Sequence, residues 1–339
     1  MNVTGFINDP LTQPENSMTE QQKNEINDVQ PSSLRHIVGQ KSVVESVTVA
    51  IDACQMDAKR FDHALMVGPP GLGKTAICQI LAAELAADYF EILGQSIKHP
   101  SDLNSVLLAA TPGSIVFIDE AHELKTEFQT ALYLALDKRK IILSGGSKSS
   151  GSPQSLPLAD FGLVLASTDE HCLLQPLRDR MRLLLRFSYY SVEELTTILL
   201  QRARALGWDI HEELLPQISQ RSRGTPRLAL RILQACRRVC RSEGEHTITA
   251  AHLERACVLD QLDDLGLGPT EQQYLNALAG GNSRLNVLSS ILGLPSRTVS
   301  TVIEPFLIRS GLLVKDDNGR RQLSGKGREH LSNSCADGV

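Results

Sequence analysis

Aromatic side chains and closely spaced cysteines are scarce in this sequence of 339 residues. Phe, Trp and Tyr make up 4% of the chain, with a single tryptophan, so a stack of aromatic rings for single-stranded nucleic acid is not expected to dominate. The seven cysteines lack the C-x-x-C spacing of zinc and redox motifs. Cys236 and Cys240 share one face of an expected helix, but no second pair completes a metal site. We therefore predict buried free thiols, which fit a reducing compartment such as the cytoplasm.

A long apolar segment and a strong positive charge are also missing. No run approaches the roughly 20 apolar residues of a membrane-spanning helix, and the first residues lack the apolar core of a signal peptide. The net charge is −5, so any contact with nucleic acid must come from a local basic patch or from several subunits together. The apolar fraction of 42% and the charged fraction of 22% are those of an ordinary globular protein.

A glycine-rich run lies between an expected strand and an expected helix. It fits the pattern G-x-x-x-x-G-K-S/T and consists of Gly68, Pro69, Pro70, Gly71, Leu72, Gly73, Lys74 and Thr75. Residues 64–67 are typical of a short buried strand, and residues 76–85 have helical periodicity. In this context backbone N–H groups can point at phosphate oxygens, and the start of the helix adds a partial positive charge. We predict that Lys74 reaches the terminal phosphates and that the Thr75 hydroxyl holds Mg²⁺; the alternative is a turn with a chance lysine.

Two carboxylates follow the next apolar run. Residues 114–118 are typical of a buried strand, and Asp119 and Glu120 come directly after them. Since the carboxyl ends of parallel strands lie at one edge of a sheet, this pair should lie beside the phosphate loop. We predict that Asp119 orients Mg²⁺ through its water shell and that Glu120 activates the attacking water. The alternative is an ordinary strand followed by an acidic helix cap.

A third buried strand, at residues 162–167, is followed by a hydroxyl and then by a pair of arginines. Thr168 can position the water or sense the γ-phosphate, although Ser and Thr end many strands. Arg178 and Arg180 follow in the sequence Pro-Leu-Arg-Asp-Arg. An arginine at this point can reach the phosphates of a neighbouring subunit and stabilise the charge of the transition state. A surface salt bridge with Asp179 is the simpler alternative.

The pattern of apolar residues divides the chain into four parts. Residues 1–30 are polar without periodicity and predict a disordered tail. Strand-like and helical runs alternate over residues 31–187, which predicts an α/β domain with a parallel sheet. Within that domain, residues 144–153 belong either to a hairpin that projects from the sheet or to a disordered insertion. Residues 188–262 are typical of an all-helical domain.

Residues 263–335 form the fourth part. Short helices precede two strands joined by a polar turn, which is the pattern of a winged helix. Between Pro269 and Leu331 there are eight Lys and Arg against five Asp and Glu, so this part is locally basic in an acidic chain. A DNA-binding surface and a merely solvated charged face both fit that excess.

The order of these motifs resembles the AAA+ ATPases, and more closely the RuvB family of Holliday-junction branch-migration motors. The matching segments are GPPGLGKT at 68–75, FIDEAH at 117–122, PLRDR at 176–180, RSRGTPR at 221–227 and EPFLIRSG at 304–311. The likeness extends from Leu34 to Leu331. It implies an α/β fold: an AAA+ P-loop core with a parallel sheet, a helical lid domain and a carboxy-terminal winged-helix domain.

The resemblance also implies roles for single residues. Thr168 corresponds to the first sensor of the family and Arg227 to the second. Arg180 corresponds to the finger that acts on the adjacent subunit, with Arg178 as the second choice. Further nucleotide-contacting positions correspond to Ile37 and Val38 at the adenine, to Tyr190, and to Ala76, which stands where the family has a second threonine. Family members form hexameric rings around duplex DNA and work with RuvA, which holds the four-way junction.

The chain departs from the family pattern at the wing. The family has a basic turn there that grips DNA phosphates, whereas this chain has Lys315, Asp316, Asp317, Asn318, Gly319 and Arg320. Lys315 and Arg320 keep two positive positions for DNA. The two aspartates should weaken phosphate binding, because that binding depends on cations that release counterions; Arg321, Lys326 and Arg328 can compensate.

We hypothesise an ATP hydrolase, dependent on ATP and Mg²⁺, that drives Holliday-junction branch migration in recombination and repair as a ring with shared ATP sites. One alternative is an ATP-gated DNA-binding regulator that uses the winged helix. The other is an AAA+ remodeler or loader that acts on a protein partner, and the acidic wing turn slightly favours it.

Overall fold

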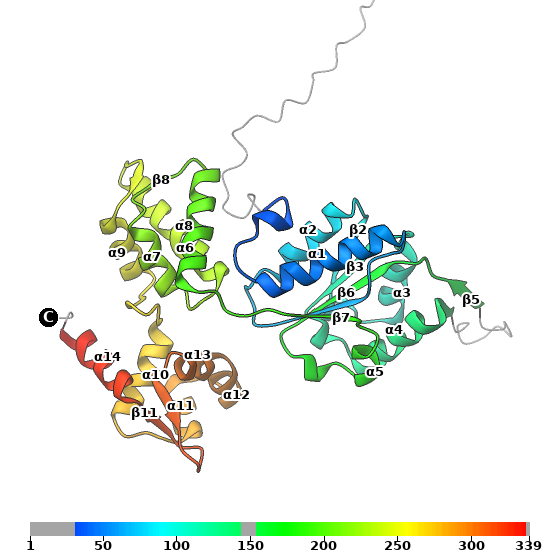
Figure 1. Ribbon diagram of the computed structural model, residues 1–339. Helices are drawn as coiled ribbons and strands as arrows, with labels where there is room; N and C mark the ends of the chain where they lie inside the picture. Colours follow the sequence, from blue (N-terminus) through cyan, green and yellow to red (C-terminus); the bar gives the residue numbers. More distant parts are fainter. Residues whose placement is uncertain (1–30, 144–153, 337–339) are drawn as a thin grey trace, which may run out of the picture.

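The computed structural model describes residues 31–143 and 154–336. The expected disordered tail at 1–30 and the serine-rich segment at 144–153 lie outside the described residues. Three units follow one another along the described chain: an α/β unit, a helical unit, and a small unit of helices with a two-stranded sheet (Figure 1).

A parallel sheet of five strands forms the centre of the α/β unit, in the order β2-β3-β6-β1-β7. The strands are β1 (Ala64–Val67), β2 (Tyr89–Leu93), β3 (Ile115–Asp119), β6 (Gly162–Ser167) and β7 (Leu183–Arg186). The three inner strands are those that the sequence predicts, and their pairing confirms a parallel sheet. The sequence does not predict the two edge strands, because β2 is interrupted by Glu91 and β7 is bounded by Arg182 and Arg186.

Alternate side chains of the sheet enter two separate hydrophobic cores. Met66 and Phe117 face the first core, whereas Leu65 and Ile118 face the second, as the strand period of two residues requires. Helices α1 (Lys41–Met56) and α2 (Lys74–Glu84) contribute to the first core; α3 (Pro100–Ala109) and α4 (Thr126–Lys138) contribute to the second. The sheet is therefore the middle of three layers (Figure 1), and the carboxyl ends of its strands share one edge.

Short elements complete the α/β unit. They are η2 (Leu34–His36), η3 (Gly94–Ser96), η4 (Ala121–Glu123), η5 (Glu170–Cys172), α5 (Gln175–Arg178), β4 (Lys140–Leu143) and β5 (Gln154–Pro157). The strands β4 and β5 pair with each other in antiparallel fashion. The strands β4 and β5 do not join the main sheet, and residues 144–153, to which the two interpretations of hairpin and insertion apply, lie outside the described residues.

Four helices dominate the second unit: α6 (Val192–Ala205), α7 (Leu214–Arg221), α8 (Pro226–Ser242) and α9 (Ala250–Leu259). Ser191 caps α6, since its hydroxyl accepts a hydrogen bond from the N–H of Glu194 and the Glu194 carboxylate accepts one from the N–H of Ser191. The prediction of an all-helical unit is wrong in one detail. β8 (Asp209–Ile210) and β9 (Thr247–Ile248) form a short parallel pair, which brings the loop before α7 against the loop before α9.

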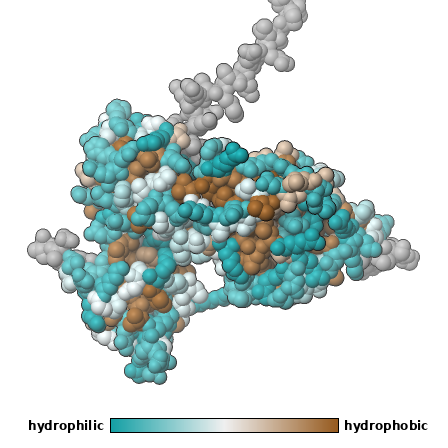
Figure 2. All heavy atoms as spheres, in the orientation of Figure 1, coloured by the Kyte–Doolittle hydropathy of each residue, from teal (hydrophilic) through white to brown (hydrophobic). Residues whose placement is uncertain are grey.

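Free thiols are mostly buried, as the sequence predicts. Among the described cysteines, Cys172 is exposed, and the buried ones are Cys54, Cys78, Cys236, Cys240 and Cys257. Across residues 31–143 and 154–336, no helix combines the length and the apolar composition of a membrane span. The surface seen in Figure 2 is largely hydrophilic, with hydrophobic residues gathered in patches. Val258 and Leu259 at the end of α9 are among the exposed apolar side chains.

The third unit is a winged helix, as predicted. Helices α10 (Pro269–Ala279), α11 (Leu285–Leu292) and α14 (Gly325–Ala336) surround one hydrophobic core together with the antiparallel strands β10 (Leu313–Lys315) and β11 (Arg321–Leu323). Another helix runs from α12 (Ser296–Thr298) through the π-helical η6 (Val299–Ile303) to α13 (Glu304–Arg309). The π turn has a cause in the sequence, because Pro305 has no N–H to donate to the carbonyl four residues earlier.

Arg223 connects the helical unit to the winged helix. Its guanidinium donates to the carbonyl of Gly266 from Nε at 2.9 Å and from Nη2 at 2.7 Å, and its Nη1 lies 2.7 Å from the Glu271 carboxylate. Arg309 of α13 donates to the carbonyl of Arg223 at 2.7 Å and lies over the ring of Tyr189. Since Tyr189 belongs to the link between the α/β and helical units, all three units meet at this junction.

Gly266 provides a test of this junction. It has a φ of 72°, and a Cβ at this position would lie 1.9 Å from the carbonyl oxygen of Arg221. Gly281 has a φ of 90° with no atom within 4 Å of such a Cβ, so it is a matched control for backbone strain alone. We expect Gly281→Ala to lower the free energy of unfolding by about 1–2 kcal/mol, which is the cost of the left-handed conformation for a residue with a Cβ. Gly266→Ala should lower the free energy of unfolding by more than Gly281→Ala does, because the winged helix must also move away from α7.

Urea unfolding of the two variants measures this difference. Equal unfolding midpoints for Gly266→Ala and Gly281→Ala would contradict a tight junction at Gly266.

Candidate functional site

The phosphate loop connects β1 to α2 at the carboxyl edge of the sheet. Gly68, Gly71 and Gly73 have φ angles of 156°, 79° and 95°, and positive angles of 79° and 95° favour glycine. Lys74 is only 7% exposed, and its Nζ donates to the carbonyl oxygens of Gly68 at 2.8 Å and Pro69 at 3.0 Å. Burial lowers the pKa of Lys74, while the carboxylates of Glu120 and Asp119 oppose that shift. The lysine is therefore held across the loop, close to the predicted acids.

The predicted magnesium ligands lie together. The Thr75 hydroxyl donates to Asp119 Oδ2 at 3.0 Å, and Asp119 Oδ1 accepts a hydrogen bond from the N–H of Glu120 at 2.8 Å. Hydroxyl and carboxylate oxygens are the ligands that Mg²⁺ prefers, so this pair fits the ion that the sequence predicts. Glu120 begins the turn after β3 with a φ of 49°, which directs its side chain away from the strand.

His122, the last residue of the FIDEAH segment, links two of the predicted residues, although the sequence assigns it no role. Its Nε2 lies 3.3 Å from Glu120 Oε2 and 3.4 Å from Thr168 Oγ1. Its Nδ1 lies 3.4 Å from Ser167 Oγ. A histidine two positions after the acid is the sequence signal for this contact, but the pairing with Thr168 depends on β3 and β6 lying side by side.

Gly94 is a second residue that the sequence analysis missed. A Cβ at Gly94 would lie 2.5 Å from the carbonyl oxygen of Glu120, so only glycine lets the end of β2 approach the acid so closely. The unpredicted edge strand β2 therefore helps to fix the backbone of Glu120.

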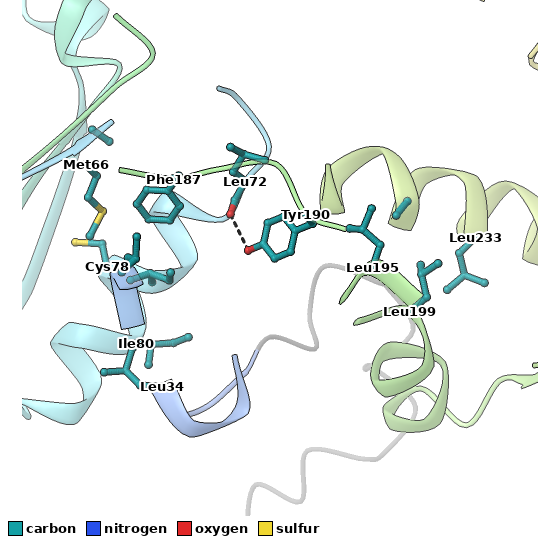
Figure 3. Close-up of a cluster of buried hydrophobic side chains, with 14 of the residues drawn as sticks. Leu34, Met66, Leu72, Cys78, Ile80, Phe187, Tyr190, Leu195, Leu199 and Leu233 are labelled. Carbon is teal, nitrogen blue, oxygen red and sulfur yellow. Dashed lines mark hydrogen bonds between the residues drawn. The ribbon is translucent and has the colours of Figure 1, made fainter. Parts of the chain in front are cut away.

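The other end of the loop meets residues from two distant segments. The Tyr190 hydroxyl donates to the carbonyl of Leu72 at 3.1 Å (Figure 3), and burial raises the pKa of Tyr190 to about 12. A Cβ on Gly39 would lie 2.8 Å from the Tyr190 ring, so the segment that contains Ile37 and Val38 passes beside this ring. Ile37 and Val38, the positions predicted at the adenine, are half-buried.

Gln40 holds these segments together and was not predicted. Its Nε2 donates to the carbonyl of Ser188 at 2.7 Å, and its Oε1 accepts from the N–H of Ser188 at 3.2 Å. The two hydrogen bonds join residues that are 148 positions apart. No local pattern marks such a pair, which explains why the sequence analysis overlooked it.

Arg227 approaches the phosphate loop from the helical unit. Its N–H donates to the carbonyl of Gly71 at 3.4 Å, and a Cβ on Gly71 would lie 2.9 Å from the Cβ of Arg227. The Arg227 side chain itself is exposed. The start of α8 therefore lies on the loop, with a cation beside the expected phosphates. Ala76, in the first turn of α2, is half-buried behind the loop.

Arg180 has an ion-pair partner of its own, 43 residues away. Its Nε lies 2.9 Å from Asp137 Oδ1 and its Nη2 lies 2.5 Å from Asp137 Oδ2, while Nη1 donates to the Pro176 carbonyl. The expected alternative of a salt bridge with Asp179 is wrong about the partner, since Gln175 donates to Asp179 at 2.6 Å. The hydrogen bond from Arg180 holds the pKa of Asp137 below its ordinary value. Arg178, the second choice, donates to Gln175.

The wing uses one of the two predicted DNA-binding cations internally. Lys315 Nζ lies 2.6 Å from Glu304 Oε2, and Arg321 Nε lies 2.8 Å from Glu304 Oε1. Glu304 is fully buried and also accepts a hydrogen bond from the Tyr274 hydroxyl at 2.9 Å. The Lys315 ammonium is therefore tied to the buried Glu304, although both Lys315 and Arg320 are exposed residues.

Asp316, expected to oppose DNA binding, has a structural role. Its Oδ1 accepts hydrogen bonds from the N–H groups of Asn318 at 3.0 Å and Arg320 at 2.7 Å. A carboxylate that accepts hydrogen bonds from two amides of its own turn stabilises the turn. One oxygen of the Asp316 carboxylate is therefore occupied within the turn. Lys326, suggested as a compensating cation, donates to the Ser310 carbonyl at 3.0 Å.

Family models match the chain in three consecutive segments. They are described as the Holliday junction DNA helicase RuvB P-loop domain at residues 29–187, the RuvB AAA lid domain at 190–263 and the RuvB C-terminal winged helix domain at 264–332. The chain belongs to the RuvB family. This membership agrees with the arrangement of phosphate loop, helical lid and winged helix described above. RuvB proteins are P-loop ATPase motors, so the chain is a nucleotide-binding protein of this ATPase class.

Several RuvB proteins are similar over nearly the whole chain. The Holliday junction branch migration complex subunit RuvB of Tropheryma whipplei is 35% identical over 308 residues, which are 89% of this chain and 89% of the relative. That of Rubrobacter xylanophilus is 34% identical over 322 residues, or 94% of this chain and 90% of the relative. The structure of the Thermotoga maritima RuvB Holliday junction branch migration motor matches with a TM-score of 0.77 at 30% identity, covering 89% of this chain and 98% of that one.

Glu304 makes the stability of the winged helix depend on pH. Burial alone would raise the pKa of Glu304, but hydrogen bonds from Arg321, Lys315 and Tyr274 outweigh it and hold the pKa below the ordinary 4.5. A carboxyl with a lowered pKa stabilises the fold above pH 4.5, and this contribution is lost as the pH falls through the lower folded-state pKa.

We therefore expect the free energy of unfolding to fall when the pH is lowered below about 4.5. Glu304→Gln should be less stable at pH 7 by roughly 3 kcal/mol, because Lys315 and Arg321 lose their partner, and its stability should change less with acid. Glu329→Gln, at an exposed position of α14, is the control. Parallel pH profiles for wild type and Glu304→Gln, measured by urea unfolding between pH 3 and 7, would refute the role of Glu304.

Proposed function

We propose that this chain is an ATP-driven motor that moves the branch point of four-way DNA junctions, as a ring whose ATP sites are shared between subunits. The observation that carries the proposal is the separation of the site into two parts. Lys74, Thr75, Asp119 and Glu120 converge at the phosphate loop, whereas Arg180 is held elsewhere by Asp137. An arginine finger can be supplied in trans by a neighbouring subunit, and Arg180, held apart from the loop of its own subunit, is suited to that role.

Each residue at the loop has a distinct task in this proposal. The loop N–H groups and Lys74 bind the β- and γ-phosphates, and Thr75 and Asp119 hold the ion. Mg²⁺, when bound there, would supply positive charge that offsets the negative charge of the phosphates. Glu120 accepts a proton from the attacking water, and His122 and Thr168 orient the Glu120 carboxylate and that water.

The remaining contacts select and sense the nucleotide. Ile37, Val38 and Tyr190 would enclose the adenine. Arg227 reports the presence of the γ-phosphate to the lid, because α8 begins directly at the loop. The other loop residues, Pro69, Pro70 and Leu72, shape the turn, and Ala76 lies in the first turn of α2 behind them.

Assembly into a ring, six subunits by the resemblance, is part of the proposal. The exposed apolar side chains of Met56 on α1 and Val258 on α9, 88% and 74% exposed, would be available for contacts in such a ring. DNA in the proposed ring lies against the winged helix, with Arg320 on the phosphates and Lys315 as support of the wing. A junction-binding protein like RuvA, the expected partner, would contact the hairpin of β4 and β5.

A second candidate is an AAA+ remodeler that acts on a protein. It is favoured by the wing, where the charges of Lys315 and Arg321 are paired with the Glu304 carboxylate. A branch-migration assay on a synthetic four-way junction, with and without RuvA and ATP, separates the two functions. Displacement of junction arms that depends on ATP supports the motor, and its absence in the presence of active ATP hydrolysis favours the remodeler.

Substitutions on the two sides of the shared site should have complementary effects. Lys74→Ala, Glu120→Gln and Arg180→Ala should each lower kcat for ATP by about a hundredfold or more, because each removes a group that acts on the reacting phosphate. Mixtures of Glu120→Gln with Arg180→Ala should recover activity, since an intact Glu120 can then meet an intact Arg180. Full ATPase activity in all three single variants would rule out this mechanism, and failure of the mixture to recover would argue against sharing.

Binding to duplex DNA should depend on salt mainly through Arg320. Loss of one phosphate contact reduces the slope of log K against log salt by about 1, so Arg320→Ala should show this reduction. Asp317→Asn should bind more tightly, because it removes a negative charge from the turn without affecting the Asp316 hydrogen bonds. Arg204→Ala, on α6 and paired with Glu212, is the control. An unchanged salt slope for Arg320→Ala, measured by fluorescence anisotropy, would exclude this contact.

A further inference from the structure

The guanidinium of Arg180 makes three hydrogen bonds within the chain, two of them to one carboxylate. Asp137 accepts from Nε and Nη2, the Pro176 carbonyl accepts from Nη1 at 2.6 Å, and the Tyr133 ring lies 5.2 Å from the guanidinium carbon. A guanidinium has five N–H donors in a planar fork. Each nitrogen uses one donor in these contacts, so one N–H remains on each of the two terminal nitrogens.

These two remaining donors form the end of the fork that matches a phosphate. Two parallel N–H groups on one planar group bind two oxygens of a phosphate at once. The Arg180 side chain is 32% exposed, and it lies at an open cavity of about 360 Å³ that is also lined by Arg60, Arg139 and Arg182. The contacts with Asp137 therefore restrain the side chain without covering the part that would meet a ligand.

Asp137 itself is attached to a rigid element. It lies in the last turn of α4, whose Phe128 and Leu132 are buried in the second hydrophobic core. The other ion pairs of the cavity do not involve Arg180: Asp160 binds Arg60 at 2.7 Å and Arg139 at 3.2 Å. Among the described residues, Asp137 is the carboxylate that fixes Arg180 through both oxygens.

We propose that Asp137 is a positioning residue that orients the guanidinium of Arg180 toward the nucleotide of the neighbouring subunit. This inference rests on the proposed shared ATP site. A long arginine side chain free in solvent has to be ordered at each turnover, whereas one held by a bidentate carboxylate presents its donors in a fixed direction. Such preorganisation acts on the transition state, so its loss lowers kcat rather than nucleotide binding.

Asp137→Asn is the decisive variant, because an asparagine keeps the size but turns an N–H₂ group toward the arginine donors. We expect kcat for ATP to fall by about ten- to a hundredfold, with KM unchanged within about twofold. Asp137→Glu should recover most of the loss, since it keeps the carboxylate. Asp160→Asn, in the same cavity, should keep wild-type kcat.

Two further measurements exclude a merely structural effect on α4. The double variant Asp137→Asn, Arg180→Ala should be no slower than Arg180→Ala alone, because Asp137 acts only through Arg180. Mixing Asp137→Asn with Glu120→Gln chains should recover ATPase activity, since the Glu120→Gln chain supplies an intact Asp137–Arg180 pair. A misfolded Asp137→Asn chain could not be rescued in this way.

The contrary outcomes are distinguishable. Wild-type kcat for Asp137→Asn beside an inactive Arg180→Ala would overturn the positioning role and leave the shared site intact. If the factors by which Asp137→Asn and Arg180→Ala lower kcat multiply in the double variant, Asp137 acts independently of Arg180. Its role is then in the stability of α4, and this result would also overturn the proposal. Full activity of Arg180→Ala would overturn the shared site itself, and the inference with it.

Discussion

At Gly68 and Gly71 the phosphate loop leaves no room for a side chain, and this steric constraint determines how the units of the chain are arranged. A Cβ on Gly68 would lie 2.8 Å from the carbonyl oxygen of Phe187, and one on Gly71 would lie 2.9 Å from Arg227. The glycines therefore do more than open the backbone to phosphates. They allow Phe187, in the segment that leads to the helical unit, and Arg227, at the start of α8, to lie directly against the loop. A change in the loop on nucleotide binding must then displace the segments that hold the lid.

The same close contacts continue to the winged helix. Tyr190, which binds the loop through its hydroxyl, also donates its N–H to the carbonyl of Gly224 at 3.0 Å. Gly224 follows Arg223, which binds Gly266 and Glu271 of the third unit. Packed and hydrogen-bonded groups thus form a continuous physical connection from the loop to the wing. In the proposed motor, this connection transmits the state of the nucleotide to the unit that meets DNA.

Motifs that combine neighbouring residues were predictable from the sequence, and contacts between distant residues were not. The inner strands, the phosphate loop and the convergence of Thr75 with Asp119 follow from local patterns, because parallel strands deliver their ends to one edge. The partners Asp137 of Arg180 and Glu304 of Lys315 could not be foreseen. A sequence records that a cation is present, but the partner depends on which helices the tertiary fold brings together. The edge strands β2 and β7 were not predicted because they are partly exposed. Their sequences contain charged residues and lack the continuous apolar run of a buried strand.

The internal use of cations changes how the charge of the winged helix is interpreted. Lys315 and Arg321 neutralise Glu304, and Lys326 binds a carbonyl, so the local excess of Lys and Arg overstates the charge that DNA would meet. A single wing with Arg320 as its main phosphate contact would bind weakly. In the proposed ring, however, several wings face the same duplex, and linked weak contacts raise the overall affinity through effective concentration. A motor must also release each contact as it moves, and a weak individual wing within a multivalent ring satisfies both requirements.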